Sequence, residues 1–232
     1  MRRERTALVL CLVALGCESL PGRPRPEDRE VRPDQIQDFR ILYSENCAGC
    51  HGSEGKGNAA LALANPVYLA IAGDADLRRA IAQGVPGTEM PGFARSAGGM
   101  LTERQVNALV EGLRAWARPD ALQGVSPPPY RATAPGDAAR GAEVVGRLCG
   151  SCHGTDGRGG SNASSIVDDS YLALVSDQGL RNTVIAGRPE LGQPDWRGYN
   201  SGRPMTEEEV TDVVAFLTSK RVEAPGRPYP TR

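Results

Sequence analysis

Apolar residues recur at helical spacing in two halves of the chain. Neither half shows the clear alternation of apolar and polar residues that a half-buried strand requires. In the first half the pattern predicts helices over residues 35–46, over residues 74–83 and from residue 102 onward. In the second half it predicts helices over residues 137–148 and from residue 206 onward. We therefore expect an all-α fold made of two similar helical parts in tandem.

Capping boxes mark the start of the last helix in both halves. Thr102-Glu-Arg-Gln105 precedes one apolar stripe and Thr206-Glu-Glu-Glu209 precedes the other. The stripes correspond at a shift of 104 residues, which relates Val106, Leu109, Val110 and Leu113 to Val210, Val213, Val214 and Leu217. The first helix of each half is expected to present its own apolar set, Ile36, Phe39, Ile41 and Leu42 in one and Ala142, Val145 and Leu148 in the other.

A pentapeptide of the form Cys-x-x-Cys-His occurs once in each half, as Cys47-Ala48-Gly49-Cys50-His51 and Cys149-Gly150-Ser151-Cys152-His153. Two thiols a helical turn apart can form thioether bonds to the two vinyl groups of one haem, and the next residue then presents an imidazole nitrogen to the iron. A zinc site and a redox-active dithiol are the alternatives for such cysteine pairs. Neither alternative requires a histidine after both pairs, and paired zinc motifs usually lie closer in sequence.

With these motifs, the chain resembles a two-domain, two-haem class I cytochrome c of the exported bacterial kind, over about residues 36–118 and 137–221. The resemblance implies two small all-α domains, each folded around one covalently bound haem c. It also implies which residues bind the two haems, namely Cys47, Cys50, His51, Met90, Cys149, Cys152 and His153, and it implies no catalytic residue.

The sixth ligand of each haem iron decides its redox behaviour, because a thioether sulfur stabilises ferrous iron and raises the potential. In the first domain, the segment Met90-Pro91-Gly92-Phe93 resembles the distal methionine segment of the family. The competing sulfur donor is Met100, which lies two residues before a helix cap and is expected to pack. We therefore predict that Met90 ligates the first iron.

The second domain departs from this pattern, because Gln193 stands at the position that corresponds to Met90. Met205 is the remaining sulfur donor, and it aligns with Leu101, directly before the cap residue Thr206. Three arrangements stay open: ligation by Met205, weak ligation by the Gln193 amide oxygen, or an iron without a protein sixth ligand. We favour a packing role for Met205 and a weak or absent sixth ligand. Unequal potentials are then expected, with the first haem higher.

Other segments are predicted to lie outside the two domains. Residues 1–16 combine three arginines with a short apolar run and predict a secretory leader. Ala14-Leu15-Gly16-Cys17 resembles a bacterial lipobox, which implies lipidation of Cys17 and a protein anchored on the periplasmic side of a membrane. The remaining segments are a tether, a proline-rich linker that is either a spacer or a strap packed on both domains, and a tail, over residues 17–35, 119–136 and 222–232.

Composition narrows the range of functions. The formal net charge is -1, and no run of basic residues indicates a nucleic-acid partner. Both histidines lie in the two motifs, so the chain offers neither a second histidine ligand for either iron nor a spare general base. Each half has about 85 residues and the chain is only 5% aromatic, so we expect the haems to complete both cores and the apoprotein to be unstable.

These features favour a carrier that takes electrons from a membrane respiratory donor and passes them to a terminal oxidase or a periplasmic reductase. One alternative is a haem enzyme that uses an open iron in the second domain, where nearby charged residues would have to assist, Arg181, Arg188, Glu190 or Asp195. Another alternative is a gas or redox sensor with the same open iron. Rapid binding of CO at one haem of two would support these alternatives over a simple carrier.

Overall fold

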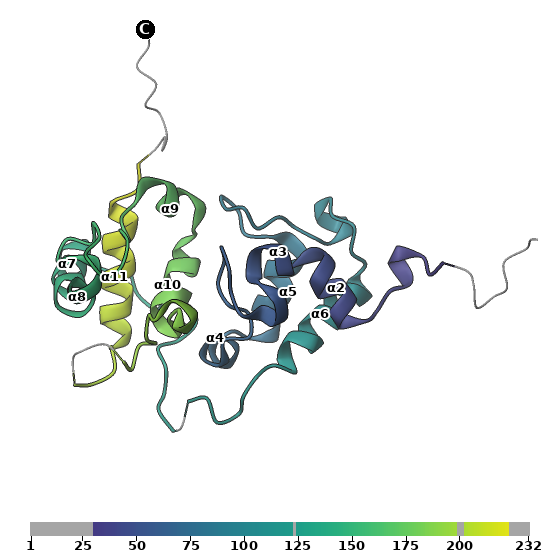
Figure 1. Cartoon of the computed structure of the whole chain (residues 1–232), viewed down its shortest axis with the longest axis horizontal. Coiled ribbons are helices and arrows are strands. Elements are labelled where there is room, and N and C mark those ends of the chain that lie inside the picture. Colours follow the sequence, from purple (N-terminus) through teal and green to yellow (C-terminus); the bar gives the residue numbers. More distant parts are fainter. Residues whose placement is uncertain (1–29, 123, 199–201, 223–232) are drawn as a thin grey trace, which may run out of the picture. The chain divides into compact units, whose positions relative to one another are not determined.

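The computed structural model describes residues 30–122, 124–198 and 202–222 (Figure 1). The predicted leader, Cys17 and most of the tether lie outside these residues, as does the tail beyond residue 222. A short 3-10 helix, η3 (Pro33–Gln35), belongs to the unit that ends at Ile36. Both helical halves belong to the compact unit that begins at Gln37.

The first half consists of short helices that lead to and from the first cysteine motif. α2 (Phe39–Asn46) ends one residue before Cys47, and α3 (Ala48–His51) contains the rest of the motif. The chain then forms η4 (Ser53–Gly55), α4 (Pro66–Ile71), α5 (Asp74–Gln83), η5 (Arg95–Ala97) and α6 (Glu103–Arg114). α6 packs against both α2 and α5.

The second half repeats this order. α7 (Ala138–Val144) continues through a π-helical turn, η6 (Val145–Cys149), into α8 (Gly150–His153). The chain then forms α9 (Asp169–Leu174), α10 (Asp177–Ala186), η7 (Pro189–Leu191) and α11 (Glu207–Ser219). α11 lies beside α7 and also contacts α10 (Figure 1). Within the described residues the only β structure is a pair of isolated bridges, and the predicted all-α fold is confirmed.

Side-chain caps decide where these helices begin. Thr102 and Thr206 form the predicted capping boxes at the starts of α6 and α11. The first helix starts later than predicted, because Asp38 caps it by accepting a hydrogen bond from the Ile41 backbone N–H at 3.0 Å. Ile36 therefore precedes the helix, and Ile41 is 43% exposed, contrary to the expected apolar set.

A glycine and an aromatic residue meet where the first and last helices of each half cross. In the first half, a Cβ atom on Gly112 would lie 2.0 Å from Cδ2 of the Phe39 ring. In the second half the glycine is on the first helix: a Cβ atom on Gly141 would lie 2.0 Å from Asp212 O and 2.8 Å from Phe216 Cβ. The large and small residues are thus exchanged between the helices, and both crossings stay closely packed.

An arginine clamps a short helix in each half. Arg114 donates to the carbonyl oxygens of Leu69 and Ala72 at the end of α4 and pairs with Asp74 at the start of α5. Arg221 makes the same contacts to the three residues 103 positions later. Because α6 and α11 correspond at a shift of 104, Arg221 stands about one helical turn later than Arg114. The two halves thus form equivalent arginine contacts from positions that do not correspond in the sequence, so aligning the halves residue by residue does not reveal them.

The proline-rich linker is a strap rather than a free spacer. Arg181 is 3% exposed, and its Nε and Nη2 atoms donate to the carbonyl oxygen of Pro129 at 3.0 Å and 2.9 Å. Two residues further along the linker, Arg131 pairs with Asp76 of α5. The linker is therefore bound to helices of both halves.

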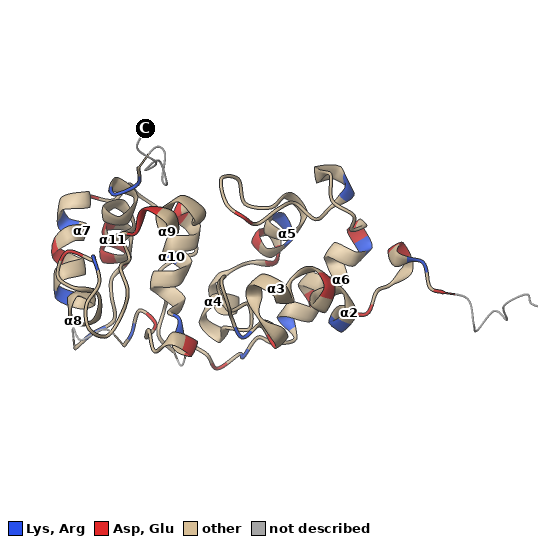
Figure 2. Ribbon diagram, turned by 45° about the horizontal axis from the view of Figure 1, so that its top comes forward, with Lys and Arg blue, Asp and Glu red and all other residues tan. Residues whose placement is uncertain are grey.

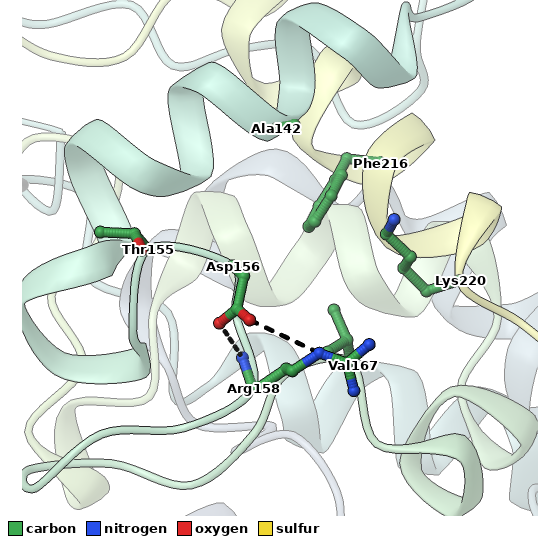
Figure 3. A pocket seen from close by; sticks show the side chains of 7 residues that line it. All are labelled: Ala142, Thr155, Asp156, Arg158, Val167, Phe216 and Lys220. Carbon is green, nitrogen blue, oxygen red and sulfur yellow. Dashed lines mark hydrogen bonds and ion pairs between the residues drawn. The ribbon is translucent and has the colours of Figure 1, made fainter.

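The two halves differ behind the loop that follows the cysteine motif. In the first half, the rings of Phe39 and Tyr43 pack against Trp116, with centroid separations of 5.1 Å and 5.0 Å. At the shift of 104, Lys220 takes the place of Trp116 in the second half. A cavity of about 370 Å³ remains there (Figure 3), and its lining consists of Ala142, Thr155, Asp156, Arg158, Val167, Phe216 and Lys220.

We expect Lys220→Trp to stabilise the second half by roughly 0.5–2 kcal/mol, the range typical of cavity-filling substitutions. The new ring would supply the packing that Trp116 supplies in the first half. Calorimetric unfolding of the haem-loaded protein measures the change. Lys220→Ala is the matched control, which removes the lysine without adding a ring and should not raise the midpoint. A midpoint that also fails to rise for Lys220→Trp would show that the cavity does not accept the indole.

Candidate haem sites

A single helical turn holds the two thiols and the imidazole of each motif together. In the first half, the backbone N–H groups of Cys50 and His51 donate to Cys47 O at 3.2 Å and 3.0 Å. The first cysteine of each motif is half-buried and the second is exposed, and all four thiols are free. Both thiols and the histidine of a motif are therefore available to one planar group lying against the turn.

The ring orientation of each histidine is set by a main-chain carbonyl group. His51 Nδ1 lies 2.8 Å from Leu61 O, and His153 Nδ1 lies 2.7 Å from Ser164 O. A neutral imidazole that donates from Nδ1 keeps the lone pair of Nε2 for a metal ion. Burial lowers the pKa of His51 and so favours this neutral form. Sequence reasoning missed Leu61 and Ser164, because a backbone carbonyl leaves no trace in residue type.

Glycine shapes the loop that follows each motif. Gly57 N–H donates to His51 O at 2.8 Å, and Gly159 N–H donates to His153 O at 2.7 Å. Gly52 has φ +78°, and a Cβ atom there would lie 2.4 Å from Gly57 O. A side chain at this position would therefore push the loop away from the histidine whose backbone it binds.

The alternatives for the cysteine pairs fit the structure less well than a haem does. Burial is the main cause that raises the pKa of Cys47 and of Cys149 to about 11, with the neighbouring thiol adding to it, whereas a reactive dithiol needs a lowered pKa. In the part of the chain that the structure describes, no three His, Cys, Asp or Glu side chains converge on a point where a metal ion could bind. Two thiols beside an imidazole with a free Nε2 are the donor set that suits a covalent haem.

Comparison with protein families decides between these possibilities. Residues 34–111 match the family described as cytochrome c oxidase, cbb3-type, subunit III, and residues 138–220 match the cytochrome c family. The chain is a two-haem cytochrome c of class I. Its cofactors are two covalently bound haem c groups, one for each cysteine pair.

Relatives of this cytochrome extend the match across both domains. The cbb3-type cytochrome c oxidase subunit CcoP of Azospirillum sp. (strain B510) is 28% identical over 73% of this chain and 58% of its own length. The subunit FixP of Azorhizobium caulinodans is 25% identical over 82% of this chain and 64% of its own. The subunit FixPc of Rhizobium leguminosarum bv. viciae is 30% identical over 83% of this chain and 63% of its own. The cytochrome thus spans less than two thirds of each of these relatives.

In the first domain of the cytochrome, the backbone holds Met90 in place. Val85 N–H donates to Met90 O at 2.9 Å, and Met90 N–H donates to Thr88 Oγ1 at 3.2 Å. Gly84 makes the close turn possible, with φ +72° and no room for a Cβ atom. Met90 is half-buried, whereas the competing Met100 is 81% exposed. Of the two methionines, Met90 is therefore the one whose surroundings suit a buried ligand.

The corresponding segment of the second domain shares one of these backbone hydrogen bonds and differs in the other. Arg188 N–H donates to Gln193 O at 3.1 Å, and Gln193 N–H donates to Arg188 O at 3.0 Å. The side-chain amide of Gln193 donates from Nε2 to Thr183 O at 3.3 Å. Position 193 therefore keeps the carbonyl contact that position 90 makes to the residue five places earlier, with an amide in place of the thioether.

Met205 lies where Leu101 lies in the first domain. Met205 N–H donates to Trp196 O at 2.9 Å, and Leu101 N–H donates to Phe93 O at 2.8 Å. Both side chains are almost fully buried, with 3% and 5% of their surface exposed. This placement agrees with the predicted alignment of Met205 with Leu101 and favours a packing role.

The charged residues that an enzyme could use are engaged in structural contacts. Arg181 binds the linker, as described above, and Arg188 pairs with Glu190. Asp195 pairs with Arg197 at 2.7 Å. Acidic and basic residues are interspersed along the helices of both domains (Figure 2). None of the helices in the described ranges is long and apolar enough to span a bilayer.

Proposed function

We propose that this cytochrome carries electrons between a membrane-bound respiratory donor and a terminal oxidase or periplasmic reductase, and that it is not itself an enzyme. The observation that carries the proposal is the pair of equivalent motifs, each with its histidine Nδ1 bound to a main-chain carbonyl, at 2.8 Å and 2.7 Å. The relatives named above are subunits of cbb3-type cytochrome c oxidases, which supports a terminal oxidase as the electron acceptor.

In this proposal each domain holds, orients and tunes one iron. When bound, haem supplies a one-electron couple between ferrous and ferric iron. The cysteines would anchor the macrocycle, the histidines would bind the iron through Nε2, and Met90 would supply a sulfur ligand in the first domain. The proposed haem ligands and attachment residues are Cys47, Cys50, His51 and Met90 in one domain and Cys149, Cys152 and His153 in the other.

We also propose that the protein is exported and anchored to the membrane through Cys17. The leader-like residues 1–16 and the lipobox-like segment support this, and both lie outside the described residues. The haem domains are proposed to extend over residues 36–118 and 137–221. A Cys17→Ser variant should appear in the soluble periplasmic fraction, and retention of this variant in the membrane would rule out the lipid anchor.

The proposal is tested by a spectroelectrochemical titration of the haem-loaded protein. We expect two one-electron steps at different potentials, and the higher potential belongs to the first haem because Gln193 replaces the sulfur donor in the second domain. Two equal and high potentials would contradict the inequality. A protein whose haems cannot be reduced and reoxidised reversibly would not be an electron carrier.

Two substitutions at Met205 test whether this residue ligates the second iron. We expect Met205→Leu to leave the number of methionine-ligated haems unchanged. It should lower the free energy of unfolding by less than about 1.5 kcal/mol, because leucine is the residue that the first domain has at this position, Leu101. Met205→Ala should lower the free energy of unfolding by roughly 2–5 kcal/mol, because it leaves a cavity in the core, and it should also leave the ligation unchanged. The methionine-to-ferric-iron absorption band counts sulfur ligands. Loss of part of that band in Met205→Leu would show that Met205 is a ligand after all.

A second candidate function rests on the same residues. If neither Gln193 nor Met205 binds the second iron, that iron can bind a small ligand, and the chain would then act as a haem enzyme or as a gas or redox sensor. The burial of Met205 and the hydrogen bond from Gln193 Nε2 to Thr183 O favour it. Rapid CO binding to one of the two ferrous haems would support this candidate, and the absence of CO binding would remove it.

A further inference from the structure

The loop that follows the first haem motif touches the distal segment of the second domain. Arg188 donates from Nη2 to Asn58 O at 2.8 Å, across 130 positions of sequence. The Arg188 guanidinium also pairs through Nε with Glu190. Glu190 itself rests against the loop, since a Cβ atom on Gly57 would lie 2.8 Å from Glu190 Oε1. Arg188 is thus held by a carbonyl of one domain and a carboxylate of the other, and only 15% of its side chain is exposed.

A buried contact nearby makes this placement specific. Asn65 caps α4 by accepting hydrogen bonds from Val67 N–H and Tyr68 N–H. Its Nδ2 atom donates to Ala186 O at 3.0 Å, at the end of α10 and two residues before Arg188. Asn65 is only 5% exposed, so its side-chain amide makes buried hydrogen bonds to backbone groups of both domains.

These contacts form a short connection between two haem sites. Gly57 N–H binds His51 O, at the proximal side of the first haem, and Asn58 is the next residue. From Asn58 O the connection passes through Arg188 to Gln193, which exchanges two backbone hydrogen bonds with Arg188. Two hydrogen-bonded contacts therefore link the loop after the first motif to Gln193, namely Asn58 with Arg188 and Arg188 with Gln193.

We propose that Arg188 is a positioning residue, which holds the distal segment of the second haem against the proximal loop of the first and so supports electron transfer between the haems. This inference rests on the proposed function as an electron carrier. The transfer moves one electron from a ferrous to a ferric iron, with no bond made or broken and no proton required. A chain of contacts alone does not establish coupling, so the test measures the transfer itself.

The test is laser-flash reduction of the haem-loaded, fully oxidised protein by a small photoreductant, followed by absorbance as the electron redistributes between the haems. We expect Arg188→Ala to slow the redistribution roughly 2- to 30-fold, the range typical of coupling through a packed network. Arg188→Lys keeps the charge but cannot reach Asn58 O and Glu190 with a planar fork, so we expect it to recover the rate only in part.

Arg158→Ala is the matched control, because it removes one arginine beside the second haem motif whose ion pair is to Asp156 of the same domain. We expect this variant to redistribute electrons at the wild-type rate. Equal slowing in Arg158→Ala and Arg188→Ala, full recovery in Arg188→Lys, or no slowing in Arg188→Ala would each overturn the proposal. If Arg188→Ala does not fold, Glu190→Gln can be used, because it weakens the ion pair that holds Arg188. This variant should slow the redistribution relative to wild type, and no slowing would overturn the proposal.

A carrier in which Arg188 plays no part can be distinguished from a chain that carries no electrons. If each haem is reduced by the photoreductant and the static titration is reversible, the chain is an electron carrier whatever Arg188 does. If neither haem cycles between its two oxidation states, the proposed function fails before the role of Arg188 is tested.

Discussion

Met90→Ala is expected to lower the midpoint potential of the first haem by on the order of 0.2 V, a fraction of the ~0.8 V that axial ligands span in haem proteins. A thioether sulfur stabilises ferrous iron relative to ferric iron. Its removal leaves water or a vacant position, which stabilises ferrous iron less, so the midpoint potential falls. The methionine-to-iron absorption band should disappear in the same variant. A spectroelectrochemical titration together with the visible spectrum of the oxidised protein measures both effects.

Met100→Ala is the control that the chain itself offers. Met100 belongs to the same loop region but is 81% exposed, so its removal should leave both the potential and the absorption band unchanged. If the band survives in Met90→Ala and is lost in Met100→Ala, the distal loop rearranges when haem binds and the ligand assignment is wrong.

The double variant Cys149→Ser/Cys152→Ser is expected to unfold the second domain, a loss on the order of 5 kcal/mol, comparable with the whole stability of a small domain. The second domain, proposed to extend over residues 137–221, is small and must bury a large cofactor to complete its core. Without the two thioether bonds, the haem would be held by the proposed ligand His153 without a covalent link, and it could dissociate. Circular dichroism and limited proteolysis of the purified variant measure the loss of helix and the new cleavage sites.

Ser151→Ala provides the control for this experiment, because it changes the same helical turn and keeps both cysteines and His153. It should leave the second domain folded and loaded. Cleavage confined to residues 137–221 in the double variant would show that the first domain folds alone. A double variant that stays fully helical and protease-resistant would contradict the view that haem completes the core.

The two domains solve the same packing problems with different residues. The crossing of first and last helices pairs Phe39 with Gly112 in one domain and Gly141 with Phe216 in the other. Such exchanges keep the local volume constant while the sequence changes. Where no exchange occurred, as at Lys220, a cavity remains in the second domain.

Features that depend on short-range patterns can be predicted from the amino-acid sequence of this cytochrome. Helical periodicity predicted the all-α fold, and Thr102 and Thr206 were identified as helix caps because a capping box closes over only four residues. The cysteine motifs were readable for the same reason, since their thiols and imidazole lie within one helical turn. Asp38 shows the limit of such patterns, because its side chain begins α2 later than the apolar spacing indicated.

Contacts between residues that are distant in the sequence depend on how the helices pack and cannot be predicted from residue types. Three features depend on where separate segments meet: the Leu61 carbonyl that orients His51, the burial of Met205, and the hydrogen bonds from Arg181 to the linker. The contact of Arg188 with Asn58 joins residues 130 positions apart. Backbone carbonyls are chemically alike at every position, so a sequence marks the arginine or histidine but not its partner. The folded packing of the helices selects that partner.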